Sequence, residues 1–271
     1  MMLNAGGISR SGREELASVV GRGRRLVSVA DVAGALGVDH VVAAKRLARW
    51  AEQGWLRRVR RGLYIPVPVD AEDPRSWSED PLVLADAVWA PCYFTGWTAA
   101  NHWNLTEQVF RTTIVKTASR VRRTRDRLLD HDFHVLHVPA TLLGWGTTGV
   151  WRGDRRVRVA DPARTVVDIL DDPRLGGGIR LCAEILTAYL SEHDSRTLVD
   201  YGDRLGNKAV FKRLGYLLEA AELPDDGLRG ACHERIAGGV VLLDPTAPAR
   251  GPRAVGWGIR VNVAVRREQP S

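Results

Sequence analysis

The sequence predicts an α+β protein, with an N-terminal winged helix-turn-helix domain and a larger mixed α/β C-terminal domain that ends in a mainly helical section. Three observations predict this class. Two short helical patterns separated by a tight turn lead into a basic hairpin within residues 26–66. Strand-length apolar runs alternate with helical patterns from residue 80, and helical patterns dominate from residue 161. The excess positive charge lies in the first quarter of the chain.

The charge distribution separates the two domains. The 271 residues carry a formal net charge of +7. Residues 1–66 hold 12 Lys and Arg against 5 Asp and Glu, whereas the other 205 residues hold 27 of each sign. A strongly basic module attached to a neutral body is typical of proteins that bind a polyanion such as nucleic acid.

Composition excludes several classes of protein. With 45% hydrophobic residues the chain can bury a core, which excludes disorder as its overall state. It has no run of roughly 18 apolar residues and no apolar signal core near its start, so we expect a cytoplasmic protein that does not bind a membrane. Cys92, Cys182 and Cys232 lie far apart without zinc-site spacing, so neither a disulfide framework nor structural zinc is expected.

The helix-turn-helix begins with a short helix over 29–36. Ser28 is a suitable N-cap for it, and Gly37 ends it because glycine tolerates the positive φ of a sharp turn. Asp39 caps a second helix from His40 to about Gln53, which stops at Gly54. Two helices joined by so short a turn predict a DNA-binding unit.

The second helix has two distinct faces. At 100° per residue, Ala43, Leu47 and Trp50 form one stripe, which we expect to pack inward. We predict that the other face enters the major groove, with Lys45 donating to a purine edge and Arg49 contacting a phosphate. The residues of this helix predicted to contact DNA are His40, Val41, Ala44, Lys45, Arg46 and Arg49.

A basic β-hairpin, the wing, follows over residues 55–66. Its predicted turn carries four arginines that suit phosphate or minor-groove contacts: Arg57, Arg58, Arg60 and Arg61. The alternative is a winged helix used only for dimerisation or protein contact, with solvated arginines. The charge separation favours DNA.

We expect the DNA-binding domain to span 1–69 and to include a basic N-terminal arm over 10–25. A Pro- and acid-rich linker covers 70–79, and the α/β domain covers 80–271. Strands are predicted at 92–94, 111–116, 133–138, 148–151 and 156–159, and extended runs at 240–243 and 259–265. Helices are predicted at 80–90, 98–104, 162–171, 179–190, 195–205 and 208–221.

No catalytic or metal-binding cluster is predicted. Along a strand, His131 and His137 would share a face about 20 Å apart while His134 points the other way, so one ion could not join them. Three aspartates form an acidic cluster at a predicted helix end before a proline: Asp168, Asp171 and Asp172. Capping and solvation at such a helix end explain these carboxylates without a metal site. The glycines at 176–178 lack phosphate-binding spacing and predict a flexible turn. We therefore expect no cofactor, no metal and no enzymatic site.

Two further charged features stand out in the larger domain. One dense basic segment is either a solvated loop or a second contact for nucleic acid or a toxin: Arg120, Arg122, Arg123, Arg125 and Arg127. Arg164 and Asp168 are four residues apart on a predicted helix and are expected to pair on its surface.

Several short segments occur together in a recognisable order. They are Arg-Gly-Leu-Tyr at 61–64, Phe-Thr-Gly-Trp-Thr-Ala at 94–99, Leu-Thr-Glu-Gln at 105–108, Ala-Asp-Pro-Ala-Arg-Thr at 160–165 with Val-Asp-Ile-Leu at 167–170, and the stretches 204–210 and 213–219. As an ordered set over residues 27–223, they resemble the AbiEi-type antitoxins of type IV toxin–antitoxin systems. The basic arm is not part of this resemblance, and the recognition-helix residues leave the operator sequence open.

The resemblance implies a winged helix that represses its own operon and a C-terminal domain that counters a cognate nucleotidyltransferase toxin. Winged-helix repressors usually read inverted repeats of double-stranded DNA, so we expect two copies per operator, as a dimer or as cooperating monomers. Two alternatives stay open. One is a ligand-sensing regulator without a toxin, and the other is an enzyme that modifies its partner.

Overall fold

The computed structural model of the chain describes residues 10–21, 26–68, 71, 73, 77–153 and 155–265. It divides into two compact units. The first contains residues up to 88 together with 126–132 and 151–155, and the second contains the remainder. The expected class, a winged helix followed by a mixed α/β domain with a helical section, is confirmed.

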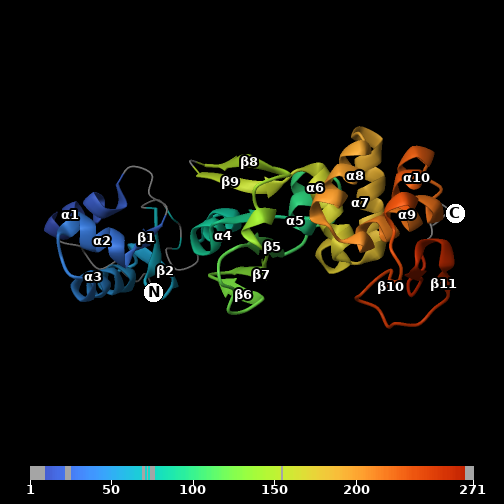
Figure 1. Cartoon of the computed structure of the whole chain (residues 1–271). Helices are drawn as coiled ribbons and strands as arrows, with labels where there is room; N and C mark the ends of the chain where they lie inside the picture. Colours follow the sequence, from blue (N-terminus) through green and yellow to red (C-terminus); the bar gives the residue numbers. More distant parts are fainter. Residues whose placement is uncertain are drawn as a thin grey trace. The chain divides into compact units, whose positions relative to one another are not determined.

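The N-terminal part is a winged helix (Figure 1). Three helices and a three-stranded antiparallel sheet of order β1-β3-β2 follow the chain order α1(Arg10–Val20), β1(Val27–Ser28), α2(Val29–Leu36), α3(His40–Glu52), β2(Leu56–Arg60) and β3(Leu63–Pro66). The expected basic arm is wrong for residues 10–20. They form α1, whose Val19 is buried in the domain core beside Leu47 and Trp50. The rest of that arm, 22–25, lies outside the described residues.

The predicted caps of the helix-turn-helix are confirmed. Ser28 accepts a hydrogen bond from the Asp31 N–H, and the Asp31 carboxylate accepts one from the Ser28 N–H, so both orphan donors are satisfied. Gly37 ends α2 with φ 64°. Asp39 Oδ1 accepts from the N–H groups of Val41 and Val42, both at 2.8 Å, which anchors the first turn of α3.

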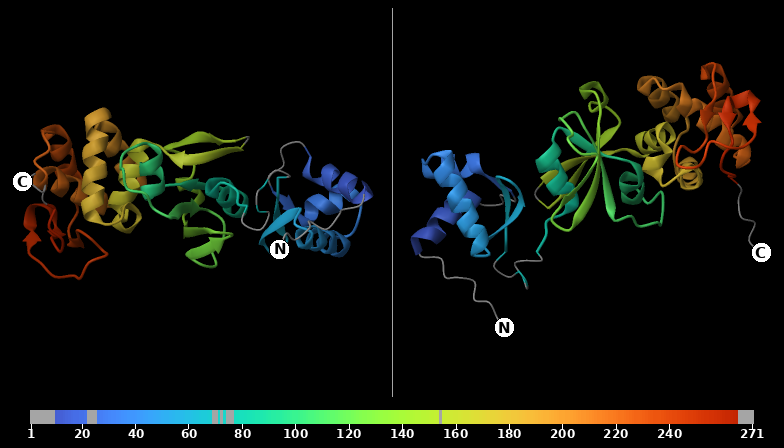
Figure 2. Two further views of the ribbon diagram at one scale, coloured as in Figure 1. Left: turned by 180° about the vertical axis from the view of Figure 1, so that it is seen from behind. Right: turned by 90° about the horizontal axis from the view of Figure 1, so that it is seen from below.

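The larger domain contains a six-stranded sheet of order β6-β7-β5-β4-β9-β8, whose strands run side by side with the usual twist (Figure 2). Its central strand β4 pairs antiparallel with β5 and parallel with β9. The strands are β4(Cys92–Phe94), β5(Thr112–Thr117), β6(Arg125–Leu128), β7(His131–His137), β8(Thr147–Arg152) and β9(Arg155–Ala160). Residues 80–90, predicted helical, form α4(Pro81–Trp89), and the next helix is α5(Gly96–His102).

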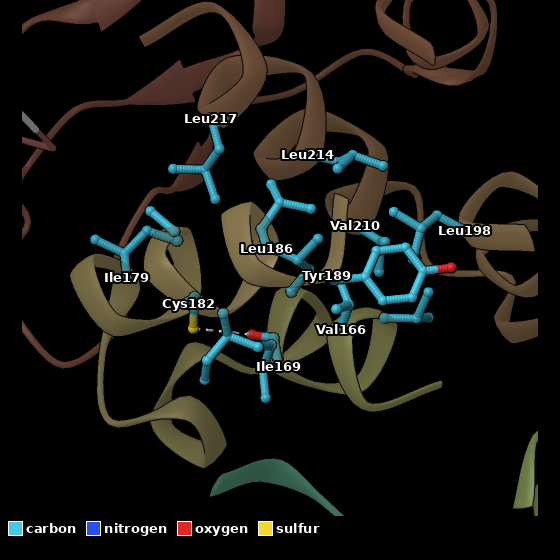
Figure 3. Close-up of a cluster of buried hydrophobic side chains, with 14 of the residues drawn as sticks. Val166, Ile169, Ile179, Cys182, Leu186, Tyr189, Leu198, Val210, Leu214 and Leu217 are labelled. Carbon is cyan, nitrogen blue, oxygen red and sulfur yellow. Dashed lines mark hydrogen bonds between the residues drawn. The ribbon is translucent and has the colours of Figure 1, made fainter. Parts of the chain in front are cut away.

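A helical section follows the sheet. It comprises α6(Pro162–Asp171), α7(Ile179–Glu192), α8(Arg196–Leu205), α9(Lys208–Ala220) and α10(Asp226–Arg235). Helix α6 contacts α5, α7, α8 and α9, and every residue from Ala163 to Leu170 is buried. Figure 3 shows the resulting core, in which Val166 and Ile169 of α6 lie among Leu186, Val210 and Leu214.

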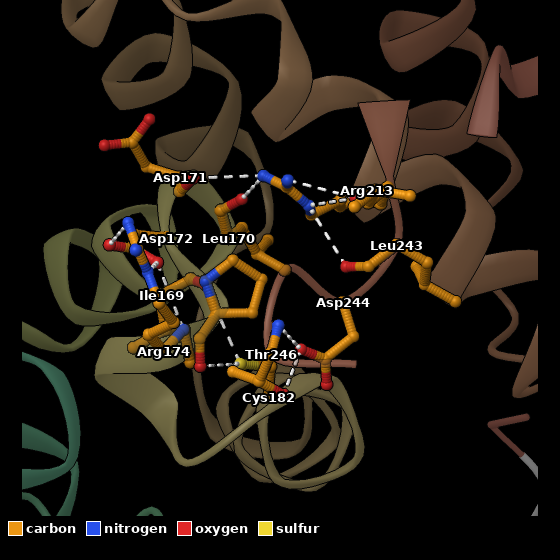
Figure 4. Close-up of polar contacts among 12 residues, drawn as sticks. Ile169, Leu170, Asp171, Asp172, Arg174, Cys182, Arg213, Leu243, Asp244 and Thr246 are labelled. Carbon is orange, nitrogen blue, oxygen red and sulfur yellow. Dashed lines mark hydrogen bonds and ion pairs between the residues drawn. The ribbon is translucent and has the colours of Figure 1, made fainter. Parts of the chain in front are cut away.

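The C-terminal residues form a small sheet of order β10-β12-β11, made of β10(Val241–Leu242), β11(Arg253–Ala254) and β12(Ile259–Arg260). Buried Arg213 of α9 holds it by donating to the carbonyl oxygens of Leu170, at 2.7 Å, and Leu243, at 3.2 Å (Figure 4). Asp244 accepts from the Ile179 N–H at 2.8 Å, so a carboxylate of this chain caps α7 beside the glycines at 176–178.

Candidate nucleic-acid interface

Helix α3 has the two faces that its sequence predicts. Ala43 and Leu47 are fully buried and Trp50 is nearly so, which confirms the inward stripe. The other side of the helix is exposed at five of the predicted contact positions, namely His40, Val41, Ala44, Lys45 and Arg49. A small, basic and open helix face of this kind fits a DNA groove.

Arg46 does not belong to this open face. It is half-buried and forms an ion pair with Glu15 of α1. Sequence periodicity placed it at the flank of α3, but it could not show that α1 would supply a carboxylate there. Arg46 therefore joins α1 to α3 within the winged helix.

The wing also differs from its prediction. Arg57, Arg58 and Arg60 lie on strand β2 rather than in the turn, and only Arg61 belongs to the turn. Within the first unit, Arg57 donates to the Trp77 carbonyl oxygen at 2.6 Å and pairs with Asp130 at 3.0 Å. Its guanidinium is thus already engaged.

Five cations of α3 and the wing are exposed: Lys45, Arg49, Arg58, Arg60 and Arg61. None of them forms an ion pair with another residue that the structure describes. They come from α3 and from the wing, the two elements with which winged helices commonly hold duplex DNA.

The basic segment of the larger domain is only partly a loop. Its last residues, Arg125 and Arg127, lie on the edge strand β6, which the sequence did not predict. All five arginines from Arg120 to Arg127 are exposed, and Arg127 donates to the Leu129 carbonyl oxygen. Alternating charge along an edge strand also protects it against pairing with other chains.

Arg164 and Asp168 form a buried cluster, so their predicted surface pairing is wrong. Both side chains are fully buried, with Arg164 Nε 3.0 Å from Asp168 Oδ1. Lys116 of β5 approaches the same oxygen at 3.0 Å, and the Tyr93 and Thr95 hydroxyls donate to the other one at 3.0 Å and 2.6 Å. The Arg164 guanidinium lies 3.4 Å from the centre of the Trp145 ring.

The electrostatics of this cluster keep Asp168 ionised. Burial is the largest single influence and would raise its pKa, but the positive charges of Lys116 and Arg164, together with hydrogen bonds from Thr95 and Lys116, lower the pKa overall. Burial and the neighbouring Asp168 raise the pKa of Tyr93 well above its usual value, so its hydroxyl stays a donor. The spacing of Arg164 and Asp168 was a sequence signal for their pairing, but nothing in the sequence indicated that Lys116 would join them.

The other candidate groups occupy separate places. His131, His134 and His137 lie along β7, and burial together with nearby Arg125 lowers the pKa of His134. Asp172 caps the turn at Pro173–Gly176 and pairs with Arg174. Within the described ranges, no three His, Cys, Asp or Glu side chains are grouped as a metal site requires. None of the helices described there is long and apolar enough to cross a membrane.

The architecture defines a class: a winged helix of the type found in transcriptional regulators, joined to an α/β domain. Residues 14–67 match the family described as "Transcriptional regulator, AbiEi antitoxin", so the winged helix is similar to the domains of that family. The resemblance noted in the sequence is thus confirmed, through a match that covers the winged helix.

Solved structures extend the likeness in fold to nearly the whole chain. The chain is similar to the crystal structure of the RV2827C protein from Mycobacterium tuberculosis, with a TM-score of 0.62 and 18% sequence identity. The similarity covers 96% of this chain and 94% of that one. A search of curated proteins by sequence finds no match.

Proposed function

We propose that this protein is an AbiEi-type antitoxin and the autoregulatory repressor of its operon. Its winged helix binds operator DNA, and its C-terminal domain counters a nucleotidyltransferase toxin. The observation that carries the proposal is the set of five exposed cations on α3 and the wing of a domain that matches this family. DNA binding places its action in the cytoplasm.

The proposed contacts divide into two kinds. Lys45 donates to a base edge in the major groove, which confers sequence preference, and Arg49 contacts a phosphate. Arg58, Arg60 and Arg61 follow the phosphate backbone from the wing. Two copies occupy an inverted repeat, and neither a metal nor a cofactor takes part.

Replacing Lys45 tests the base-reading role. On a duplex selected from a random library by the full chain, Lys45→Ala is expected to weaken binding by about 1–3 kcal/mol, because one good base contact is lost. Fluorescence anisotropy on the selected duplex and on random DNA measures the difference. Lys208→Ala, at an exposed lysine of α9, is the control and leaves both affinities unchanged. Equal losses on both duplexes would exclude base reading by Lys45.

The antitoxin role is tested separately by growth. Co-expression with a nucleotidyltransferase encoded beside this gene is expected to restore growth that the enzyme alone arrests. Lys45→Ala is expected to keep this protection, because the proposed toxin-directed domain is unchanged. Continued growth arrest in the presence of the full chain would contradict the antitoxin role and leave DNA binding unaffected.

The exposed arginines from Arg120 to Arg127 support a second contact, to nucleic acid or to the toxin. Replacing Arg120, Arg122 and Arg123 together by alanine distinguishes the two in the same pair of assays. Loss of affinity for random duplex assigns the segment to nucleic acid, and loss of growth protection assigns it to the toxin.

A further inference from the structure

Helix α3 exposes apolar surface that no other residue described by the structure covers. Val41 is 65% exposed and Val42 is 36% exposed, and neither is part of the core that Ala43, Leu47 and Trp50 form. Valine is also a weaker helix former than alanine because its branched side chain restricts χ1 in a helix. Two such residues at the start of a solvent-facing helix therefore indicate a binding role.

The position of Val41 directs it toward a partner of α3. Asp39 fixes the first turn of the helix through two 2.8 Å hydrogen bonds, so Val41 lies at the ordered N-terminal end. Lys45 follows one turn later on the same face. Ala44 and Ala48 are exposed there, and their short side chains allow a partner to approach the helix closely. The N-terminal residues of a recognition helix are those that contact base edges.

Charge identifies the occupant of this apolar surface. Lys45 and Arg49 flank it without an ion pair among the described residues, so a second copy of α3 would bring like charges together. A polyanion is the better partner for this surface, because its negative charges would pair with Lys45 and Arg49. Exposed Glu52, at the opposite end of the helix, disfavours phosphate there and leaves the N-terminal half as the contact region.

Among the base edges in the major groove, thymine alone offers an apolar group, its C5 methyl. We propose that Val41 reads thymine methyl groups, and that each operator half-site places a thymine against the N-terminal turn of α3. This inference rests on the proposed function, because it specifies which base the DNA-binding helix recognises.

Deoxyuridine substitution tests the inference directly, since it removes the methyl group and keeps base pairing. The probe is the duplex that the full chain selects from a random library, together with a matched set in which each thymine is replaced in turn. At one position, loss of the methyl is expected to weaken wild-type binding about fourfold, from the roughly 0.8 kcal/mol that one buried methyl group contributes. Val41→Ala is expected to weaken binding to the thymine duplex by a similar factor and to be insensitive to uracil at that position.

The Val41→Ala variant is expected to fold, because alanine favours a helix and because shortening this exposed side chain creates no cavity in the core. Val255→Ala, at a valine 86% exposed in the C-terminal part, is the matched control and is expected to keep full sensitivity to uracil. Wild-type binding that ignores uracil at every position would overturn the inference, as would a Val41→Ala variant that stays as sensitive as wild type. Either result would leave selective DNA binding intact, whereas equal affinity for all duplexes would refute the proposed function itself.

Discussion

At the scale of single residues, Asp168 lies at the centre of a buried cluster of charged and polar side chains. It is fully buried and receives hydrogen bonds or ion pairs from Lys116, Arg164, Tyr93 and Thr95. One carboxylate thus compensates two buried cations. Such a cluster is stable only while every member is present, because a lone buried charge is costly.

Replacing Asp168 with asparagine is expected to destabilise the protein by about 3–5 kcal/mol, since Lys116 and Arg164 would stay buried without a counter-charge. Urea unfolding measures the effect. Glu192→Gln, at an exposed carboxylate at the end of α7, is the control and is expected to change stability little. A loss below about 1 kcal/mol for Asp168→Asn would contradict the role of the cluster.

The same carboxylate predicts a pH dependence of stability. Its pKa is lowered in the folded protein, so the folded state is favoured above the unfolded pKa of about 3.9 and loses that advantage as the pH falls through the lower, folded value. The free energy of unfolding of the wild type is therefore expected to fall steeply below about pH 4. Asp168→Asn is expected to show a shallower fall in urea titrations over this pH range. Parallel curves would contradict this assignment.

At the scale of elements, α9 is the helix on which the C-terminal residues are fastened. Lys212 donates to the Gly239 carbonyl oxygen at 2.7 Å. Arg213 donates to the carbonyl oxygens of Leu170 in α6, Leu242 in β10 and Leu243. Gly215 lies beneath the Trp257 ring, and the Trp257 indole donates to Glu219 at 2.7 Å. The C-terminal residues can thus pack on α9 because two buried cations, Lys212 and Arg213, bind their carbonyl oxygens and because Gly215 leaves space for the Trp257 ring.

Two glycine substitutions separate packing from helix propensity. A Cβ at Gly215 would lie 2.0 Å from the Trp257 ring, whereas nothing lies within 4 Å of one at Gly230 in α10. Gly215→Ala is expected to lower the free energy of unfolding by about 1–3 kcal/mol through overpacking. Gly230→Ala is expected to raise it by up to about 1 kcal/mol. Thermal unfolding compares them, and stabilisation by both would mean that Trp257 does not rest on Gly215.

At the scale of the whole molecule, the dominant feature is the separation of charge. All of the net charge of +7 resides in residues 1–66, while the rest of the chain is balanced. Folding selects among those basic residues. Arg46 and Arg57 pair with carboxylates within the first unit, whereas Lys45, Arg49, Arg58, Arg60 and Arg61 are exposed and form no ion pair among the described residues, although Arg60 donates to the Val88 carbonyl oxygen at 3.4 Å.

This selection predicts unequal effects on salt dependence. Replacing Arg58, Arg60 and Arg61 together by alanine is expected to reduce the slope of log K against log salt for random duplex by up to about 3 units, one for each phosphate contact. Arg57→Ala is expected to change it much less, because Asp130 and the Trp77 carbonyl already hold that guanidinium. Anisotropy titrations between low and moderate salt give both slopes. A drop for Arg57→Ala of a third or more of the drop for the triple variant would refute the distinction.

Local patterns were sufficient for much of this fold. The helix-turn-helix, its caps at Ser28 and Asp39, the stripe of α3 and most strands and helices of the larger domain follow from periodicity and turn residues, which act between neighbours in the chain. Helices α1 and α10 and strands β6 and β11 were missed. Their sequences are rich in charge or glycine, and packing against other elements stabilises them.

The sequence by itself determined where the basic domain lies, which face of α3 turns inward and which family the domain resembles, because these depend on residue order and short-range geometry. Only the tertiary structure decided which charged side chains are paired or buried and which stay exposed. Arg46 meets Glu15, Arg57 meets Asp130, and Asp168 is buried with Arg164 because α6 is covered on every side. Charge pairing across long stretches of chain depends on which elements fold together, and no local pattern contains that information.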